Sequence, residues 1–330
     1  MSTTHASVSV RPPADEASTA QFADDVRYYL SQSPCQLPSR YLYDALGSAL
    51  FDAICQLPWY GLTRAETELL TRHADEIFAA LSPLGRIVEL GSGSGEKLAT
   101  LLGARRRQVF PVHLHLVDIS KLALETASRA LSAFDDVLVV THQAPYEVGL
   151  EEVSREGFAG GRSLVLFLGS NIGNFDPPSA DAMLSQIRAA LEPGDGFLIG
   201  ADLVKPERDL LLAYDDPLGV TAAFNLNLLA RINRELGGNF DLSGFTHRAV
   251  WNSEASRIEM HLVSARLQHI RVPGAQIDLV MKEGDPIWTE SSYKYRPDDV
   301  IAMLGRNGFR LHKQWIEPAA QFALTLVDAQ

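Results

Sequence analysis

The spacing of apolar residues differs between two parts of the chain. In the first part, short apolar runs rich in β-branched residues alternate with longer runs whose apolar residues recur every three or four positions. The short runs lie at residues 86–91, 113–118, 136–140, 163–169 and 197–203. Neighbouring parallel strands need long crossover connections, so this alternation predicts an α/β fold with a doubly wound, Rossmann-like parallel sheet covered by helices on both faces.

The pattern changes after Pro206. A helical stretch at 221–236 is followed by strand-like segments at 257–265 and 276–281, with Pro-Gly and Gly-Asp turns between elements. This order predicts an α+β unit with antiparallel strands. A helix at 298–309 and two strands after it are then expected to join the edge of the first sheet. The α+β unit is therefore predicted to be an insertion.

These patterns predict two domains and an arm. Residues 1–19 are rich in Ser, Thr, Ala and Pro, so we expect a mobile N-terminal arm. The first domain is expected to comprise residues 62–203 and 296–330, and the second residues 20–61 and 204–295. Thr63 and Glu66 have the spacing of a capping box, which predicts the start of a helix there.

Composition and charge narrow the class of protein. Of 330 residues, 46% are hydrophobic and 21% are charged, which excludes global disorder, and the formal net charge of −12 disfavours nucleic acid or an anionic membrane as partner. No apolar run approaches the ~18–20 residues that span a bilayer. The chain has two cysteines, Cys35 and Cys55, too few for a disulfide framework. We therefore expect a cytoplasmic monomer that acts on a small molecule.

A glycine-rich turn follows the first predicted strand, in VELGSGSGEK at 88–97. Such a turn lets the backbone approach a ligand and directs free N–H groups of the next helix toward it. The sequence does not fit a P-loop, because Gly95 is followed by Glu96, and Glu96 also occupies the place of the third glycine of a dinucleotide fingerprint. A tight turn without a ligand is the alternative.

Asp118 ends the second predicted strand, roughly 20-odd residues beyond the turn, where an acidic side chain receives ribose hydroxyls in nucleotide-binding sheets. The alternative is a cap for the helix that begins near Ser120. Glu-x-Gly-x-Gly followed by an acidic end to the second strand is also typical of class I S-adenosylmethionine-dependent methyltransferases. The pattern therefore favours methyl transfer over hydride transfer by an NAD-dependent oxidoreductase.

Eight segments in the same order closely resemble the ergothioneine-pathway L-histidine Nα-methyltransferases. They lie at 41–52, 57–66, 88–97, 167–175, 202–225, 231–236, 251–262 and 289–297. The resemblance begins near residue 25 and covers nearly all of the remaining chain. It implies a class I methyltransferase-like fold with an inserted substrate domain. It also implies an enzyme that uses S-adenosylmethionine to methylate the histidine α-amine three times, giving hercynine.

The resemblance also implies roles for individual residues, none of which binds a metal. The residues that would hold S-adenosylmethionine are Gly91, Lys97 and Asp118, with the ribose on Asp118. Those that would bind the substrate are Asn174 and Tyr214 for the carboxylate, Tyr60, Glu290 and Ser292 for the imidazole, Met260 for the pocket wall, and Tyr43 and Phe51 beside the amine. Tyr43 is the candidate for orienting the amine. Amide and phenol donors suit a carboxylate, and a carboxylate accepts an imidazole N–H.

Three positions depart from the family pattern. HQAPYE at 142–147 lacks the Asp that the family often carries after the third strand, where it faces the adenine amine. Gly61 follows Tyr60, and Asn171 stands where Thr is familiar. These departures leave open how adenine is held and how the pocket is shaped.

Some of these residues have simpler interpretations. Glu290 would form an ion pair with Lys294 if that stretch were helical. The alternative for Tyr43 is ordinary aromatic packing. Asp215 and Asp216 are expected to be turn and cap residues.

His113 and His115 share one face of a strand but lack a third metal ligand, so packing or surface roles are expected for both.

Two other functions also remain open for the chain. They are N-methylation of another amino acid or an indole amine, and a non-catalytic nucleotide-binding module.

Overall fold

The computed structural model describes residues 15–104, 111–158 and 160–330. The chain divides into two compact units. We call residues 62–204 and 295–330 the α/β unit, and residues 15–61 and 205–294 the α+β unit. Of the predicted arm at 1–19, residues 1–14 lie outside the described part of the chain, and helix α1 begins at Asp15.

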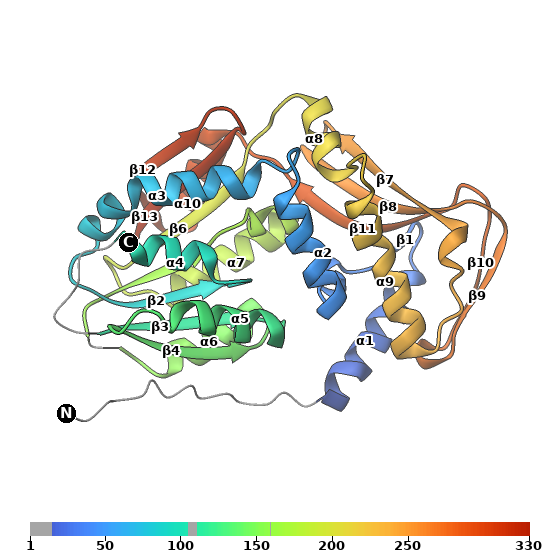
Figure 1. Cartoon of the computed structure of the whole chain (residues 1–330), viewed down its shortest axis with the longest axis horizontal. Coiled ribbons are helices and arrows are strands. Elements are labelled where there is room, and N and C mark those ends of the chain that lie inside the picture. The colour runs from blue at the N-terminus through green and yellow to red at the C-terminus, as the bar shows by residue number, and fades with distance from the viewer. Residues whose placement is uncertain (1–14, 105–110, 159) are drawn as a thin grey trace. The chain divides into compact units, whose positions relative to one another are not determined.

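The α/β unit contains a seven-stranded sheet in the order β12-β13-β6-β5-β2-β3-β4 (Figure 1). Its strands and helices are α3 (Leu62–Ala80), β2 (Leu84–Leu90), α4 (Glu96–Gly103), β3 (Val112–Asp118), α5 (Lys121–Leu131), β4 (Val137–Gln143), α6 (Tyr146–Arg155), β5 (Arg162–Phe167), α7 (Pro177–Ala189), β6 (Gly196–Asp202), α10 (Pro297–Arg306), β12 (Phe309–Glu317) and β13 (Phe322–Ala329). Strands β2 to β6 are parallel, whereas β13 runs antiparallel to both β6 and β12. The predicted α/β fold is confirmed, including the last two strands at the edge of the sheet.

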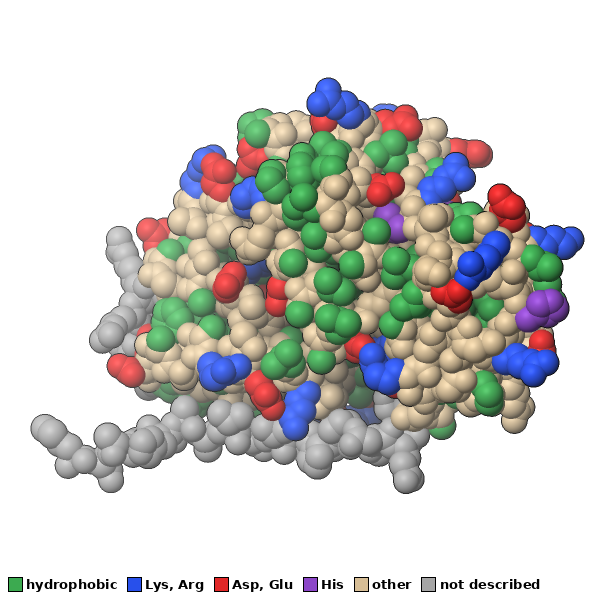
Figure 2. Space-filling view, turned by 45° about the vertical axis from the view of Figure 1, so that its right-hand side comes forward, with side chains coloured by type: hydrophobic (Ala, Val, Ile, Leu, Met, Phe, Trp, Pro, Cys, Tyr) green, Lys and Arg blue, Asp and Glu red, His purple; other side chains and the backbone are tan. Residues whose placement is uncertain are grey.

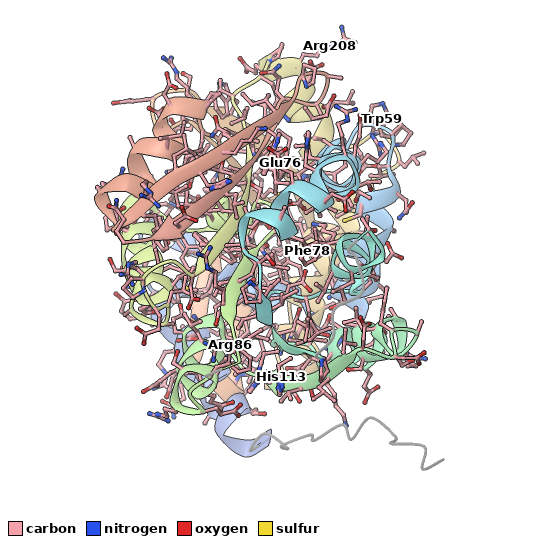
Figure 3. All side chains as sticks on the ribbon, turned by 90° about the vertical axis from the view of Figure 1, so that its left-hand side faces the viewer. Trp59, Glu76, Phe78, Arg86, His113 and Arg208 are labelled. Atoms are coloured by element: carbon pink, nitrogen blue, oxygen red, sulfur yellow. The ribbon has the colours of Figure 1, made fainter. Side chains whose placement is uncertain are left out.

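Burial explains why these runs form strands. Every residue of β2 and β6 is buried, as expected for parallel strands with helices over both faces. One core joins apolar side chains of the sheet, such as Phe167 and Phe197, to Leu184 of α7 and Met303 of α10. Helix α3, which carries Glu76 and Phe78 (Figure 3), contacts β12 through a hydrogen bond from the Trp315 indole to Glu76.

The predicted capping box at Thr63 and Glu66 is wrong. Helix α3 begins at Leu62, so Thr63 already lies within it. Glu66 belongs to the buried face of the helix, and its carboxylate accepts hydrogen bonds from the backbone N–H of Gly169 at 2.8 Å. The side chain is therefore directed into the unit.

The α+β unit contains a four-stranded sheet in the order β1-β11-β8-β7 and a two-stranded sheet of β9 and β10. Its elements are α1 (Asp15–Leu30), β1 (Cys35–Gln36), α2 (Ala45–Gln56), α8 (Glu207–Tyr214), α9 (Val220–Leu236), β7 (Phe245–Asn252), β8 (Arg257–Ser264), β9 (Gln268–Val272), β10 (Ile277–Met281) and β11 (Pro286–Tyr293). Strands β7, β8 and β11 are antiparallel, as predicted for this part. Asp216 accepts hydrogen bonds from the N–H groups of Val220 and Thr221 at the start of α9, which confirms its cap role.

Acidic and basic side chains are interspersed over the face in Figure 2. Among the helices of the described residues, none has the length and apolar character needed to cross a membrane.

Candidate functional site

The glycine-rich turn of the α/β unit joins β2 to α4. Gly91, Gly93 and Gly95 all have positive φ, at 80°, 51° and 77°. A Cβ on Gly95 would lie 2.8 Å from Ala127, whereas a Cβ on Gly93 would meet no described atom within 4 Å. The turn is therefore packed against α5 at one end and open around Gly93, where a ligand can reach the backbone.

Asp118 links this turn to the end of β3. Its carboxylate accepts from the N–H of Gly93 at 3.1 Å and from the N–H of Ser120 at 2.8 Å. The cap of α5 is Ser120, whose hydroxyl oxygen accepts from the N–H of Ala123. Burial raises the pKa of Asp118, while the two backbone N–H groups lower it. Asp118 thus fixes the turn, and its binding of a ribose stays a prediction.

Lys97, on α4, forms an ion pair with Glu66 of α3 at 2.5 Å. Glu66 is fully buried and also accepts from the N–H of Gly169, after β5. Gly200 of β6 makes room for it, because a Cβ there would lie 2.0 Å from a Glu66 oxygen. Glu66 therefore ties the start of α4 to the ends of two strands. This role was not predicted, because a helical pattern alone does not show that a Glu is buried.

Glu89, the sixth residue of β2, is a second buried carboxyl of this unit and is only 2% exposed. Its Oε2 has no hydrogen-bond partner among the described residues. Burial raises the pKa of Glu89 to about 8, against the opposing effect of Lys97. Buried polar atoms are rarely left unpartnered, so this oxygen points to a ligand. The signal in the sequence was an acid among the apolar residues Ile87, Val88 and Leu90.

The segment at 142–147 places an aromatic ring beside the turn. Tyr146 begins α6, and its ring lies 5.3 Å from that of Phe167. A Cβ on Gly91 would lie 3.0 Å from the Tyr146 hydroxyl and 2.7 Å from the Asn171 amide nitrogen. Asn174 lies in the same 3-10 helix as Asn171, at 171–174, and is half-buried. Two of the departures from the family pattern, the segment at 142–147 and Asn171, therefore each place a side chain against Gly91.

In the α+β unit, the structure brings four predicted site residues into one aromatic cluster. The ring of Tyr43 lies 5.5 Å from those of Phe51 and Phe224. Phe51 lies 6.3 Å from Tyr60, and Tyr60 lies 6.1 Å from Tyr214. Phe224, on α9, was missed because it looks like any apolar residue of a helix. The packing interpretation of Tyr43 is compatible with a place in a pocket wall.

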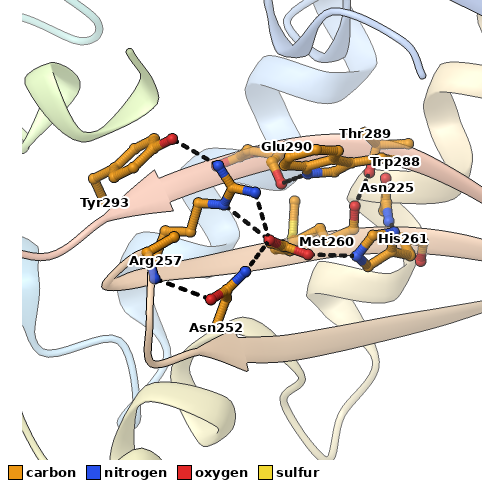
Figure 4. Close-up of polar contacts among 11 residues, drawn as sticks. Asn225, Asn252, Arg257, Met260, His261, Trp288, Thr289, Glu290 and Tyr293 are labelled. Atoms are coloured by element: carbon orange, nitrogen blue, oxygen red, sulfur yellow. Dashed lines mark hydrogen bonds and ion pairs between the residues drawn. The ribbon is translucent and has the colours of Figure 1, made fainter. Parts of the chain in front are cut away.

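Strand β11 presents Glu290 beside Met260 because of a β-bulge (Figure 4). The pairing with β8 shifts between Trp288 and Glu290, so Thr289 is an extra residue. The Thr289 hydroxyl donates to the carbonyl of Met260 at 3.0 Å, and the Trp288 indole donates to the carbonyl of Glu290 at 2.8 Å. Opposed residues in antiparallel strands share a face, so Glu290, Met260 and Ser292 lie on one face of the sheet.

The Glu290 carboxyl is in a strand, so the alternative of a helical pair with Lys294 is wrong. Its Oε2 is buried and has no hydrogen-bond partner among the described residues. Burial raises the pKa of Glu290 to about 7, and the charge of Lys294 lowers it. This carboxyl is therefore available to accept a hydrogen bond from a ligand.

Ser292, Tyr214 and Lys294 form a buried triangle. The Lys294 ammonium donates to the Tyr214 hydroxyl at 2.8 Å and to the Ser292 hydroxyl at 2.7 Å. The two hydroxyl oxygens are 2.8 Å apart. Lys294 is 3% exposed, and its Nζ lies 4.6 Å from the centre of the Tyr214 ring. From the sequence, Lys294 was interpreted only as a partner of Glu290, so its contacts with Tyr214 and Ser292 were not predicted.

The opposite face of the same sheet carries a polar layer. Arg257 pairs with Glu259 at 2.7 Å and donates to the Tyr293 hydroxyl at 2.7 Å. Its guanidinium also lies 4.4 Å from the centre of the Trp288 ring (Figure 4). Cation–π stacking of this kind restrains Trp288, which in turn holds the bulge.

The strand histidines of the α/β unit pack within it. His115 lies 3.1 Å from His142, which lies 3.0 Å from Glu152. Burial lowers the pKa of His115 to about 4, so its imidazole is neutral at pH 7. His113, labelled in Figure 3, lies against the ring of Phe158. No group of three or more His, Cys, Asp or Glu that could hold a metal ion occurs in the described ranges.

Residues 22–329 match the family described as histidine-specific, S-adenosylmethionine-dependent methyltransferase. The chain belongs to this family. It is 41% identical over 314 residues to the histidine N-alpha-methyltransferase of Mycolicibacterium smegmatis, covering 95% of this chain and 96% of that protein. The protein of the same name from Mycobacterium tuberculosis is 39% identical over 303 residues, covering 92% and 93%. Ergothioneine biosynthesis protein 1 of Schizosaccharomyces pombe is 28% identical over 304 residues, covering 90% of this chain and 39% of that protein.

Membership in this methyltransferase family confirms the resemblance noted in the sequence, and it confirms methyl transfer with S-adenosylmethionine as donor. The residues of the α/β unit fit that donor. The turn is open at Gly93, the carboxylate of Asp118 lies beside it, and the buried Oε2 of Glu89 has no described partner. A donor that carries an ammonium and a sulfonium suits an acidic site.

Proposed function

We propose that this protein methylates the α-amine of L-histidine to the trimethyl form, hercynine, in ergothioneine biosynthesis. The observation that carries the proposal is the half-buried Glu290, whose Oε2 is buried without a described partner and which lies opposite Met260. An imidazole N–H pairs with such an oxygen, whereas an apolar side chain leaves it unpaired at a cost in free energy. The mycobacterial relatives are both named histidine N-alpha-methyltransferases, which supports the same substrate.

The two units divide the work in this proposal. The predicted donor domain, 62–203 and 296–330, holds S-adenosylmethionine through Gly91, Lys97 and Asp118. The predicted substrate domain, 20–61 and 204–295, holds histidine. The compact α/β and α+β units support these boundaries. Because Lys97 is paired with Glu66, the proposed contact of Lys97 with the donor depends on that ion pair.

The substrate roles are proposed residue by residue. Tyr214 donates to the substrate carboxylate, and Asn174 of the α/β unit is assigned to the same group. Glu290, Ser292 and Tyr60 bind the imidazole. Met260 forms one wall of the imidazole pocket, which its place opposite Glu290 supports.

Tyr43 and Phe51 are proposed to line the space beside the amine, with Tyr43 orienting it. S-adenosylmethionine supplies an electrophilic methyl group on a sulfonium. The neutral amine nitrogen forms the new bond to that carbon while the carbon–sulfur bond breaks, and the nitrogen then loses a proton before the next transfer. No covalent bond to the enzyme is needed. An aromatic wall excludes water and holds the nitrogen in place, and positioning of this kind supplies up to ~7–11 kcal/mol of a barrier.

We further propose a cytoplasmic monomer without a nucleic-acid partner. The net charge of −12 opposes binding to phosphate backbones, and Cys35 and Cys55 form no disulfide within the described residues, as suits a reducing compartment. Light scattering of the purified protein tests the monomer.

Incubation with methyl-labelled S-adenosylmethionine and a panel of amino acids tests the activity. Fragment masses from histidine are expected to place one, two and then three methyl groups on the α-nitrogen. Methylation of a ring nitrogen would contradict the proposal. A product from tryptophan or an indole amine but not from histidine would support the alternative substrate class, and donor binding without any product would support a non-catalytic module.

A further inference from the structure

The buried triangle of Lys294, Tyr214 and Ser292 constrains its own hydrogens. An ammonium has donors only, so both hydroxyl oxygens accept from Lys294. The contact between the two hydroxyls uses one of their two hydrogens. One hydroxyl hydrogen is therefore left for an acceptor outside the triangle.

Acidity decides which hydroxyl donates outward. A phenol is a much stronger acid than an aliphatic hydroxyl, so it is the better donor to a charged acceptor. When the acceptor is a substrate carboxylate, Ser292 therefore donates to Tyr214, and the hydrogen of Tyr214 points outward. The result is a chain of donors from Lys294 through Ser292 to Tyr214. Each hydrogen bond in such a chain polarises the next.

The positive charge at the start of this hydrogen-bond chain belongs to Lys294, which is buried. Lys294 is almost fully buried, and its Nζ is close to the Tyr214 ring as well as to the hydroxyl. Its charge also lowers the pKa of Glu290, so its field acts on the face that carries Glu290 and Ser292. Burying a lysine costs free energy, which a counter-charge on a ligand offsets.

We propose that Lys294 is a positioning residue that sets selectivity for a substrate with an α-carboxylate. It does so by orienting and polarising the Tyr214 hydroxyl. This inference rests on the proposed function, because it takes Tyr214 as a ligand of the substrate carboxylate. Lys294 does not itself touch the substrate in this account.

The test compares L-histidine with L-histidinamide, which keeps the amine and the imidazole but has no negative charge. For Lys294→Met, kcat/KM for histidine is expected to fall roughly 10- to 100-fold, mainly through KM, because the hydrogen bond from Tyr214 to the carboxylate loses the orientation and polarisation that Lys294 supplies. The value for histidinamide should fall clearly less, because a neutral amide oxygen gains less from a polarised donor than a carboxylate does. Affinity for S-adenosylmethionine, measured by calorimetry, should be unchanged. Lys282→Met, which removes an exposed lysine of the same unit, should leave both substrates unaffected.

Tyr214→Phe provides a second route if Lys294→Met does not fold. It should reduce selectivity for histidine over histidinamide, and Lys294→Arg should retain most of it. Adding Lys294→Met to Tyr214→Phe should cause little further loss, because the two residues act as one chain.

Equal losses for histidine and histidinamide in these variants would overturn the role of Lys294 and leave it structural. Unchanged selectivity in Lys294→Met or in Tyr214→Phe would also overturn it. A wild-type protein that forms no methylated histidine would instead overturn the proposed function.

Discussion

The two units build their binding residues in different ways. In the α/β unit, the backbone dominates, through three glycines at positive φ and N–H groups that hold Asp118 and Glu66. In the α+β unit, side chains dominate, and they come from distant parts of the sequence, such as Tyr43 and Glu290. A site formed by backbone groups can therefore be recognised from a short sequence motif. A site formed by side chains from distant segments depends on how the whole unit folds.

The units also share one feature. Each contains a carboxyl with a buried oxygen that has no partner in the described part of the chain, Glu89 in one and Glu290 in the other. Burial raises the pKa of both, to about 8 and about 7. Asp118 and Glu66, by contrast, are held by the fold itself. Glu66 therefore serves stability, Glu89 and Glu290 are the candidates for ligand recognition, and Asp118 combines a structural link with a proposed ligand contact.

The largest effect is expected for Glu66→Ala. Removing one partner of a buried ion pair costs about 3–5 kcal/mol, and here the loss also leaves the N–H of Gly169 unpaired. Urea unfolding followed by circular dichroism measures this. Glu68→Ala, at an exposed site on the same helix, should cost less than about 1 kcal/mol. If the two variants unfold alike, Glu66 does not support the α/β unit.

Asp118→Ala should weaken S-adenosylmethionine binding by about 1.5–3 kcal/mol, the scale of hydrogen bonds to a charged group. The reason is loss of the proposed ribose contacts together with the link to Gly93. Calorimetric titration of the folded variant measures it. Unchanged affinity would limit Asp118 to holding the turn.

Glu290→Ala should reduce kcat/KM for histidine by a comparable ~1.5–3 kcal/mol while affinity for S-adenosylmethionine stays the same. The ratio of activity with tryptophan to activity with histidine should rise, because the cost of an unpaired carboxyl is gone. Steady-state kinetics with both substrates measure the shift. Equal losses for both, with weaker donor binding, would make Glu290 a structural residue.

The last expected effect is on how stability depends on pH. Because the pKa of Glu290 rises from 4.5 to about 7 in the folded protein, its contribution to stability is full below pH 4.5 and is lost as pH rises toward 7. Without histidine, Glu290→Gln should therefore flatten the fall in unfolding free energy over this range, by roughly 2–3 kcal/mol at most. Urea unfolding at pH 5 and pH 8 measures it. Glu283→Gln, at an exposed position, should follow the wild type, and a wild-type slope in Glu290→Gln would contradict the assignment.

Much of the fold was predictable because its signals are local. The five parallel strands, the glycine turn and Asp118 follow from apolar runs and from residues within a few positions of them. The fate of Glu66 was not predictable in this way. A Glu in the first turn of a helix fits both a capping box and a buried ion pair. The absence of a side chain at Gly200 leaves room for the buried carboxylate, and this space is not visible in the local sequence.

The α+β unit shows the same limit more strongly. The resemblance to a family supplied Glu290, Ser292 and Tyr214, but no local pattern indicated Lys294 behind them or Phe224 beside Tyr43. Their roles arise from pairing between strands and from contacts between helices far apart in sequence. The contacts of these side chains with a substrate stay a prediction, which the variants above test.

The bulge at Thr289 has a consequence for how such a protein diverges over evolutionary time. In an unbroken strand Thr289 would stand opposite Met260 and Glu290 would turn to the other face, whereas the extra residue lets each half of β11 keep its own alternation. A lineage that gained or lost one residue at this point would retain the same inward side chains. A change in strand length at this point would therefore leave the substrate preference unchanged. Sequences of relatives are then best aligned on Glu290 itself, with any gap placed at the bulge.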